Sequence, residues 1–82
     1  MKTERLNLKL MERAPVDLTV ARLLRIPGVV SVERLFPGET DPELSRLYIV
    51  ETNPLLAEQV LTVLRQDSDV EYAETSPKRK LI

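Results

Sequence analysis

The 82-residue sequence contains neither cysteine nor histidine. Without cysteine there can be no disulfide, no thiolate nucleophile and no thiolate metal site. Without histidine the usual general base and the commonest transition-metal ligand are missing as well. Hydrolytic triads are therefore excluded, and the sequence predicts a protein that is not an enzyme and has no catalytic residue, metal or cofactor.

Other residues that could carry chemistry lack the patterns of known sites. Gly28 and Gly38 are the only glycines, so no phosphate-binding loop is present. None of the four serines lies in a nucleophile-elbow sequence or beside a plausible base. The acidic residues Glu39, Asp41 and Glu43 lack the calcium-loop pattern with its central glycine, so we interpret this segment as a solvated loop.

Aromatic residues are scarce, and the basic residues are concentrated near the end of the chain. Only 4% of the residues are aromatic, so no base-stacking platform is visible. Lys78, Arg79 and Lys80 supply three of the twelve basic residues, and the rest of the chain has nine basic against thirteen acidic residues. An acidic body argues against binding to nucleic acid. The first residues never reach the apolar run of a signal peptide or membrane span, so we expect no membrane partner.

The sequence does contain a succession of short periodic segments. Residues 5–11 alternate apolar and polar side chains, which predicts a half-buried first strand. β-Branched residues predict a second strand over 29–36, and alternation predicts a third over 46–51 and a fourth over 70–74. Prolines, a glycine and acidic residues predict a hairpin loop over 37–44.

Two helices are expected between these strands. Asp17 offers a side-chain oxygen to cap the first helix, which should stop at the Pro-Gly pair at 27–28. Asn53 and Pro54 predict the start of the second helix, because asparagine caps free amides and proline suits the first helical position. Apolar residues at helical spacing then continue to about Arg65.

This order of elements predicts an α+β fold, the ferredoxin-like βαββαβ sandwich. Two strand-helix-strand units in so short a chain fit a four-stranded antiparallel sheet with both helices on one face. We expect residues 1–77 to form a single domain and residues 78–82 to form an extended C-terminal tail.

Alternation also predicts which side chains face the core. Val30 and Val32 should face the helices from the second strand, and Val70 and Tyr72 should share a face of the fourth. The uncovered face of the sheet should display Asn7, Lys9, Ser31, Glu33, Tyr48, Val50 and Ala73. The last three are more apolar than a solvated face requires. They indicate either a docking face or the few apolar residues that any antiparallel sheet tolerates.

The segment DSDVEYAETSPKRKLI, residues 67–82, resembles the end of subtilisin-type serine protease propeptides, the inhibitor domains that precede the mature protease. Those domains share a Val-x-Tyr-x-Glu strand, matched here by Val70, Tyr72 and Glu74, and the same order of strands and helices. The resemblance implies an inhibitor or intramolecular folding chaperone of a subtilisin-like serine protease, acting in cis or in trans. It also implies an extracellular or periplasmic location, although no signal peptide is visible in this sequence.

The resemblance implies a binding mode as well. The uncovered sheet face would dock on the protease, and the tail would lie in the active-site cleft with Ile82 in the primary specificity pocket. The next three subsites would be filled by Leu81, Lys80 and Arg79, although an apolar residue is usual where Arg79 falls. Glu74 and Ser76 match positions that cap the amino ends of two protease helices, and Ser76 departs from the pattern because it brings no charge.

Other interpretations remain open. The basic run could be a solvated tail or a processing site. The domain could be a ferredoxin-like interaction or oligomerisation module whose sheet pairs with a second copy, whereas the propeptide interpretation predicts a monomer when free. An acylphosphatase-like enzyme would need a glycine-rich phosphate loop after the first strand, where MERAPV, residues 11–16, offers Arg13 but no glycine.

Overall fold

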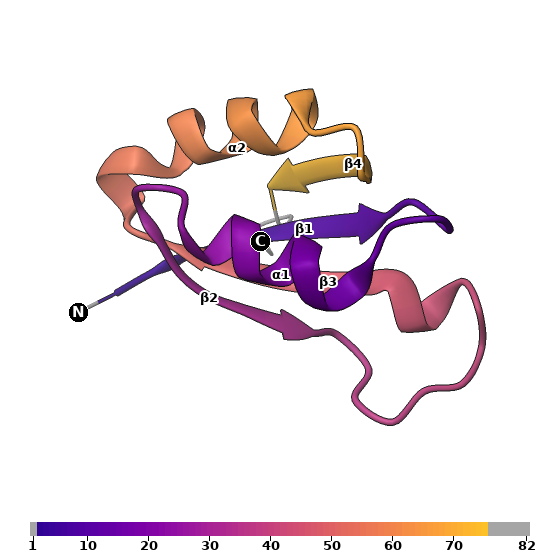
Figure 1. Ribbon diagram of the computed structural model, residues 1–82. Helices are drawn as coiled ribbons and strands as arrows, with labels where there is room; N and C mark the ends of the chain where they lie inside the picture. Colours follow the sequence, from indigo (N-terminus) through magenta and orange to yellow (C-terminus); the bar gives the residue numbers. More distant parts are fainter. Residues whose placement is uncertain (1, 76–82) are drawn as a thin grey trace.

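The computed structural model describes residues 2–75, which form one four-stranded sheet and two α-helices (Figure 1). The strands are β1 (Glu4–Leu10), β2 (Val29–Arg34), β3 (Leu47–Thr52) and β4 (Val70–Thr75). The helices are α1 (Val16–Leu24) and α2 (Ala57–Gln66), with short 3₁₀ turns η1 (Leu44–Arg46) and η2 (Pro54–Leu56) before β3 and α2. The sheet order is β2-β3-β1-β4 with antiparallel neighbours throughout, which confirms the ferredoxin-like prediction.

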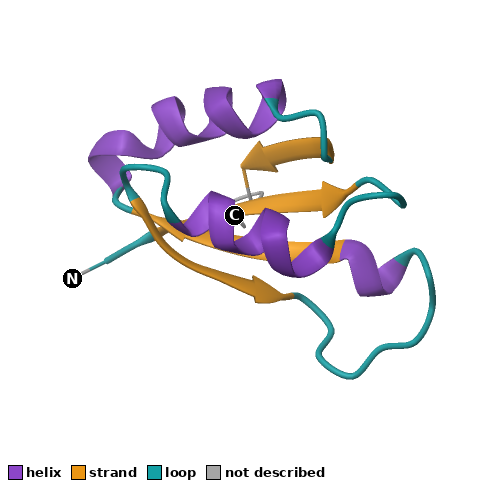
Figure 2. Cartoon of the chain, in the orientation of Figure 1, coloured by secondary structure: helices purple, strands orange, loops and turns teal. Residues whose placement is uncertain are grey.

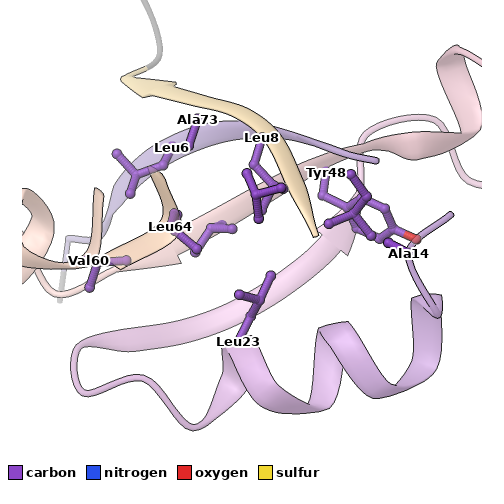
Figure 3. Packing of buried hydrophobic residues seen from close by; sticks show 11 residues of the cluster. Leu6, Leu8, Ala14, Leu23, Tyr48, Val60, Leu64 and Ala73 are labelled. Carbon is purple, nitrogen blue, oxygen red and sulfur yellow. The ribbon is translucent and has the colours of Figure 1, made fainter. Parts of the chain in front are cut away.

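The core lies between the sheet and the two helices (Figure 3). Leu6 and Leu8 of β1 belong to the same buried cluster as Leu23 of α1 and Val60 and Leu64 of α2, so both helices cover one face of the sheet. All five side chains are at most 1% exposed. Each contributes about 1.5–3 kcal/mol through burial, which is a large share of the stability available to so small a domain.

The third strand turns Tyr48 and Val50 into this core, and Ala73 of β4 joins them. The prediction that these three residues form the uncovered face of the sheet is therefore wrong. The reason is the pairing with β1, which sets Val50 beside Leu6 and Tyr48 beside Leu8. Directly paired residues project from the same face of a sheet, so the buried leucines of β1 determine which half of β3 is buried.

A β-bulge in β4 explains why Ala73 is buried and Tyr72 is not. Leu10 pairs with Val70, but the next residue of β1, Lys9, pairs with Tyr72, so Glu71 is an extra residue on β4. A bulge of this kind shifts the alternation by one residue. Val70 therefore faces the core while Tyr72 is 43% exposed on the opposite face, and the prediction that they share a face is wrong.

A second irregularity has the same effect in β2. Val29 pairs with Thr52 and Ser31 with Glu51, so Val30 is the extra residue. Val29 and Val32 pack against the core, whereas Val30 is 53% exposed. The core assignment of Val32 is confirmed, and that of Val30 is wrong.

The helix starts agree only partly with the sequence signals. Asn53 accepts a hydrogen bond from the amide of Leu55 at 3.0 Å, as expected, but the capped turn is η2, and α2 begins three residues later. Helix α1 begins without a side-chain cap. Asp17 lies in its first turn, where a negative charge suits the helix dipole, so the prediction that Asp17 caps the helix is wrong.

A three-residue ion-pair cluster ties α1 to the turn that follows α2. Arg22 donates to Asp67 Oδ1 at 2.8 Å and to Asp69 Oδ2 at 2.9 Å. Asp67 also accepts from the amide of Asp69 at 2.9 Å, which orders the turn itself. Because two carboxylates share one guanidinium, the two halves of the chain are joined at this end of the sandwich.

Gly28 is required where the chain passes from α1 into β2. Its φ angle is +98°, and a Cβ atom placed on it would lie 2.7 Å from Cβ of Leu56. Its carbonyl accepts from the amide of Asn53 at 2.7 Å, so the start of β2 lies tightly against η2. Gly38 also has a positive φ, +81°, but nothing lies within 4 Å of its Cβ position.

This contrast predicts that Gly28→Ala destabilises the fold more than Gly38→Ala. Both substitutions carry the backbone strain of a positive φ, about 1–2 kcal/mol, but only the first also displaces Leu56. We expect a total loss of about 3 kcal/mol for Gly28→Ala, measured by urea unfolding. Equal losses for the two variants would contradict the close packing of β2 against η2.

Candidate protein-binding face

The helices leave the other face of the sheet uncovered (Figure 2). We call this surface the open face and define it by the strand pairing, which aligns its side chains in three rows. The first row is Leu35, Leu47, Lys9 and Tyr72, the second is Glu33, Ile49, Asn7 and Glu74, and the third is Ser31, Glu51 and Arg5.

Part of the open face is apolar. Leu47 and Ile49 of β3 are half-buried and have Leu35 beside them, and the exposed ring of Tyr72 lies on the far side of Lys9. Large side chains of this kind, gathered on one face and rimmed by charge, are typical of a protein-binding surface.

Sequence reasoning missed Leu47, Ile49 and Tyr72 as candidate binding residues. For Tyr72 a signal existed, because Tyr72 and Glu74 are two residues apart in a strand and must share a face. For β3 no such signal was present, since Leu47 and Ile49 are as apolar as Tyr48 and Val50.

Much of the charge on the open face is matched within the protein. Arg5 lies 3.6 Å from Glu51, which also accepts a hydrogen bond from the hydroxyl of Ser31 at 3.2 Å. Glu33 and Glu74 are exposed and form no ion pair with any residue between 2 and 75.

Lys9, near the end of the inner strand β1, is the centre of an ion-pair cluster on the open face. Its ammonium group donates to Glu43 in the loop between β2 and β3 and lies 3.2 Å from Glu71 in the β4 bulge. Glu43 also pairs with Arg46 at 3.0 Å, and Arg46 donates to the carbonyl of Leu10 at 3.1 Å. These bonds fasten the long loop before β3 to the end of the inner strand β1.

The same cluster shifts the pKa values of Lys9 and Glu43. The hydrogen bond from Lys9 holds the pKa of Glu43 below its ordinary value of 4.5, and the charge of Lys9 adds to this effect. In turn, the hydrogen bond to Glu43 raises the pKa of Lys9. Both shifts mean that the charged pair is favoured in the folded protein.

The structure places few of the predicted site residues on the open face. Glu74 lies there, as the docking hypothesis requires, whereas Tyr48, Val50 and Ala73 are in the core. The remaining predicted site residues lie outside the described part of the chain: Ser76, Arg79, Lys80, Leu81 and Ile82.

Residues 2–75 contain neither a candidate membrane span nor a candidate metal site. In that range neither helix has the length and apolar character needed to cross a bilayer. No three acidic side chains of that range come together in a way that could hold a metal ion.

Comparison of the chain with protein-family models, with curated proteins and with solved structures finds no match. The likeness to subtilisin-type propeptides therefore rests on the motif in residues 67–82 and on the order of the elements.

The assignment of the two faces of β3 predicts opposite outcomes for neighbouring substitutions. Val50→Thr puts a hydroxyl into the core and should cost about 2 kcal/mol of unfolding free energy, because that group has no partner there. Ile49→Thr changes the open face and should cost less than about 1 kcal/mol. Both variants keep a β-branched side chain, so strand propensity is matched. Urea unfolding measures both, and a larger loss for Ile49→Thr would contradict the assignment.

The pKa shift of Glu43 predicts a pH-dependent contribution to stability. Because the folded-state pKa is depressed, the pair with Lys9 stabilises the fold at neutral pH, and this contribution is lost as the pH falls through that pKa. Glu43→Gln should therefore unfold more easily than the wild type at about pH 7, and the difference should shrink as the pH falls below 4.5. Urea unfolding across this range measures it. A difference independent of pH would show that the pair does not act through its charge.

Proposed function

We propose that this protein inhibits a subtilisin-like serine protease, or assists its folding, by docking the open face on the protease and laying the C-terminal tail in the active-site cleft. The observation that carries the proposal is the placement of the Val-x-Tyr-x-Glu motif. Tyr72 and Glu74 project from the open face, where a partner can contact them, while Val70 anchors the strand in the core. The proposed function needs no catalytic residue, cofactor or metal, and no nucleic acid or membrane.

The bulge at Glu71 makes this division of the motif possible. In a regular strand Val70 and Tyr72 would face the same way, so one of them would be misplaced. With the extra residue, the valine contributes to stability and the tyrosine and glutamate are available for binding. A docked complex of ordinary size buries about 1,600 Å² in total, to which one sheet face and a tail can both contribute.

The described part of the chain ends on a strand that contributes to the open face. β4 is an edge strand of the sheet and ends at Thr75, so residues 79–82 follow only a few positions after the proposed docking surface. In the proposed complex Arg79, Lys80, Leu81 and Ile82 lie extended in the cleft and pair their backbone with the enzyme. Each such hydrogen bond contributes about 1 kcal/mol net. Glu74 and Ser76 would face the amino ends of two protease helices, as in the proteins that the sequence resembles.

The main alternative is an oligomerisation module whose open faces pair with each other. The charge of the open face argues against it, because Glu33, Glu51 and Glu74 outnumber Arg5 and Lys9. Pairing two net-negative faces is unfavourable, whereas a partner rich in cations or amide donors is complementary. We therefore propose that the free protein is a monomer.

The proposal predicts measurable inhibition when the protein is titrated into a panel of subtilisin-like proteases. Deletion of residues 79–82 should raise the inhibition constant by at least about a hundredfold, since several backbone bonds of about 1 kcal/mol are lost together. Circular dichroism should show an unchanged fold, because the deleted residues follow the last described strand.

Two outcomes would count against this proposal. Full potency without the tail would contradict binding in the cleft, and inhibition of no protease in the panel would contradict the function itself. Size-exclusion chromatography is the matched check on the alternative, because a stable dimer that hides the open face would favour the oligomerisation module.

A further inference from the structure

The second row of the open face crosses all four strands without a break. Glu33 of β2 pairs with Ile49 of β3, Ile49 with Asn7 of β1, and Asn7 with Glu74 of β4. Neighbouring strands lie about 4.8 Å apart, so the two carboxylate-bearing ends of this row are separated by about 14 Å. The row therefore has an acidic residue at each edge of the sheet and an apolar residue near its centre.

Glu33 and Glu74 differ from the other acids on or beside the open face. Glu51 lies beside Arg5, and Glu71 lies beside Lys9, so those charges are matched inside the protein. Glu33 and Glu74 have no ion-pair partner within residues 2–75. A partner that covers this row removes water from both carboxylates and must supply hydrogen-bond donors or cations at both points.

We propose that the open face recognises its protease partner through Glu33 as well as Glu74, with Ile49 as the apolar contact between them. This inference rests on the proposed function and specifies which proteases the protein can inhibit. A protease surface without a hydrogen-bond donor or cation opposite Glu33 or Glu74 would bind poorly, because docking would bury an unpaired carboxylate.

The spacing also indicates the chemistry opposite Glu33. If Glu74 faces the amino end of a protease helix, Glu33 lies about 14 Å away across the sheet. That is too far to share the same helix end, because the favourable effect of the helix dipole falls off within the first turn. A long cationic side chain, Lys or Arg, can reach that point and form a charge-assisted hydrogen bond. Glu33 is therefore a specificity-determining contact to a basic residue of the protease.

The test compares Glu33→Gln with Glu58→Gln in inhibition assays on subtilisin and the other proteases of the panel. Glu58 is exposed in the first turn of α2, on the helical side of the sandwich, and forms no ion pair within the described residues, so its variant controls for the loss of one negative charge. We expect Glu33→Gln to raise the inhibition constant by about fivefold to tenfold and Glu58→Gln by less than about twofold. Glu33→Arg should weaken inhibition further, because it places like charges together.

The salt dependence of the association rate distinguishes the loss of a charge contact from a change in shape complementarity. The association rate of the wild type should fall as salt rises from about 50 mM to about 500 mM, and Glu33→Gln should flatten this dependence while Glu58→Gln leaves it unchanged. If the wild type inhibits and Glu33→Gln behaves as Glu58→Gln does in both assays, the inference is overturned and the proposed function stands. If the wild type inhibits no protease, both the inference about Glu33 and the proposed function are contradicted.

Discussion

The burial of alternate leucines on β1 is the interaction on which the rest of this structure depends. Leu6, Leu8 and Leu10 are at most 1% exposed, and β1 pairs with both β3 and β4 in the middle of the sheet. Each residue opposite one of these leucines must also face the helices. The buried leucines thereby decide which side chains of β3 and β4 enter the core and, because alternate residues project oppositely, which ones form the open face.

The bulges on the two outer strands modify this simple alternation and give the open face its character. In β4 the extra residue Glu71 moves Tyr72 to the open face, and in β2 the extra residue Val30 keeps Ser31 and Glu33 there. Both bulges lie on edge strands, where irregular pairing also makes it harder for another chain to extend the sheet. In the proposed complex the partner therefore meets the face of the sheet rather than its edges.

Polar contacts at the margin of the open face hold the neighbouring loop and bulge in place. Lys9 holds the loop before β3 through Glu43 and holds the β4 bulge through Glu71, and Arg46 closes the loop onto the carbonyl of Leu10. On the helical side, Arg22 holds the turn between α2 and β4 against α1. A surface already ordered in this way loses less conformational entropy on docking, which favours affinity.

The amino-acid sequence by itself determined the number, type and order of the elements and hence the ferredoxin-like fold, because proline, glycine and asparagine separate segments of clear periodicity. It also determined the two faces of β1, where leucine alternates with asparagine and lysine. Only the tertiary structure decided the faces of β3, since Tyr48 and Val50 are as apolar as Leu47 and Ile49, and the choice depends on pairing with β1. The faces of β2 and β4 likewise depended on bulges, which arise from how one strand is registered against its neighbour and leave no periodic signal in either strand alone.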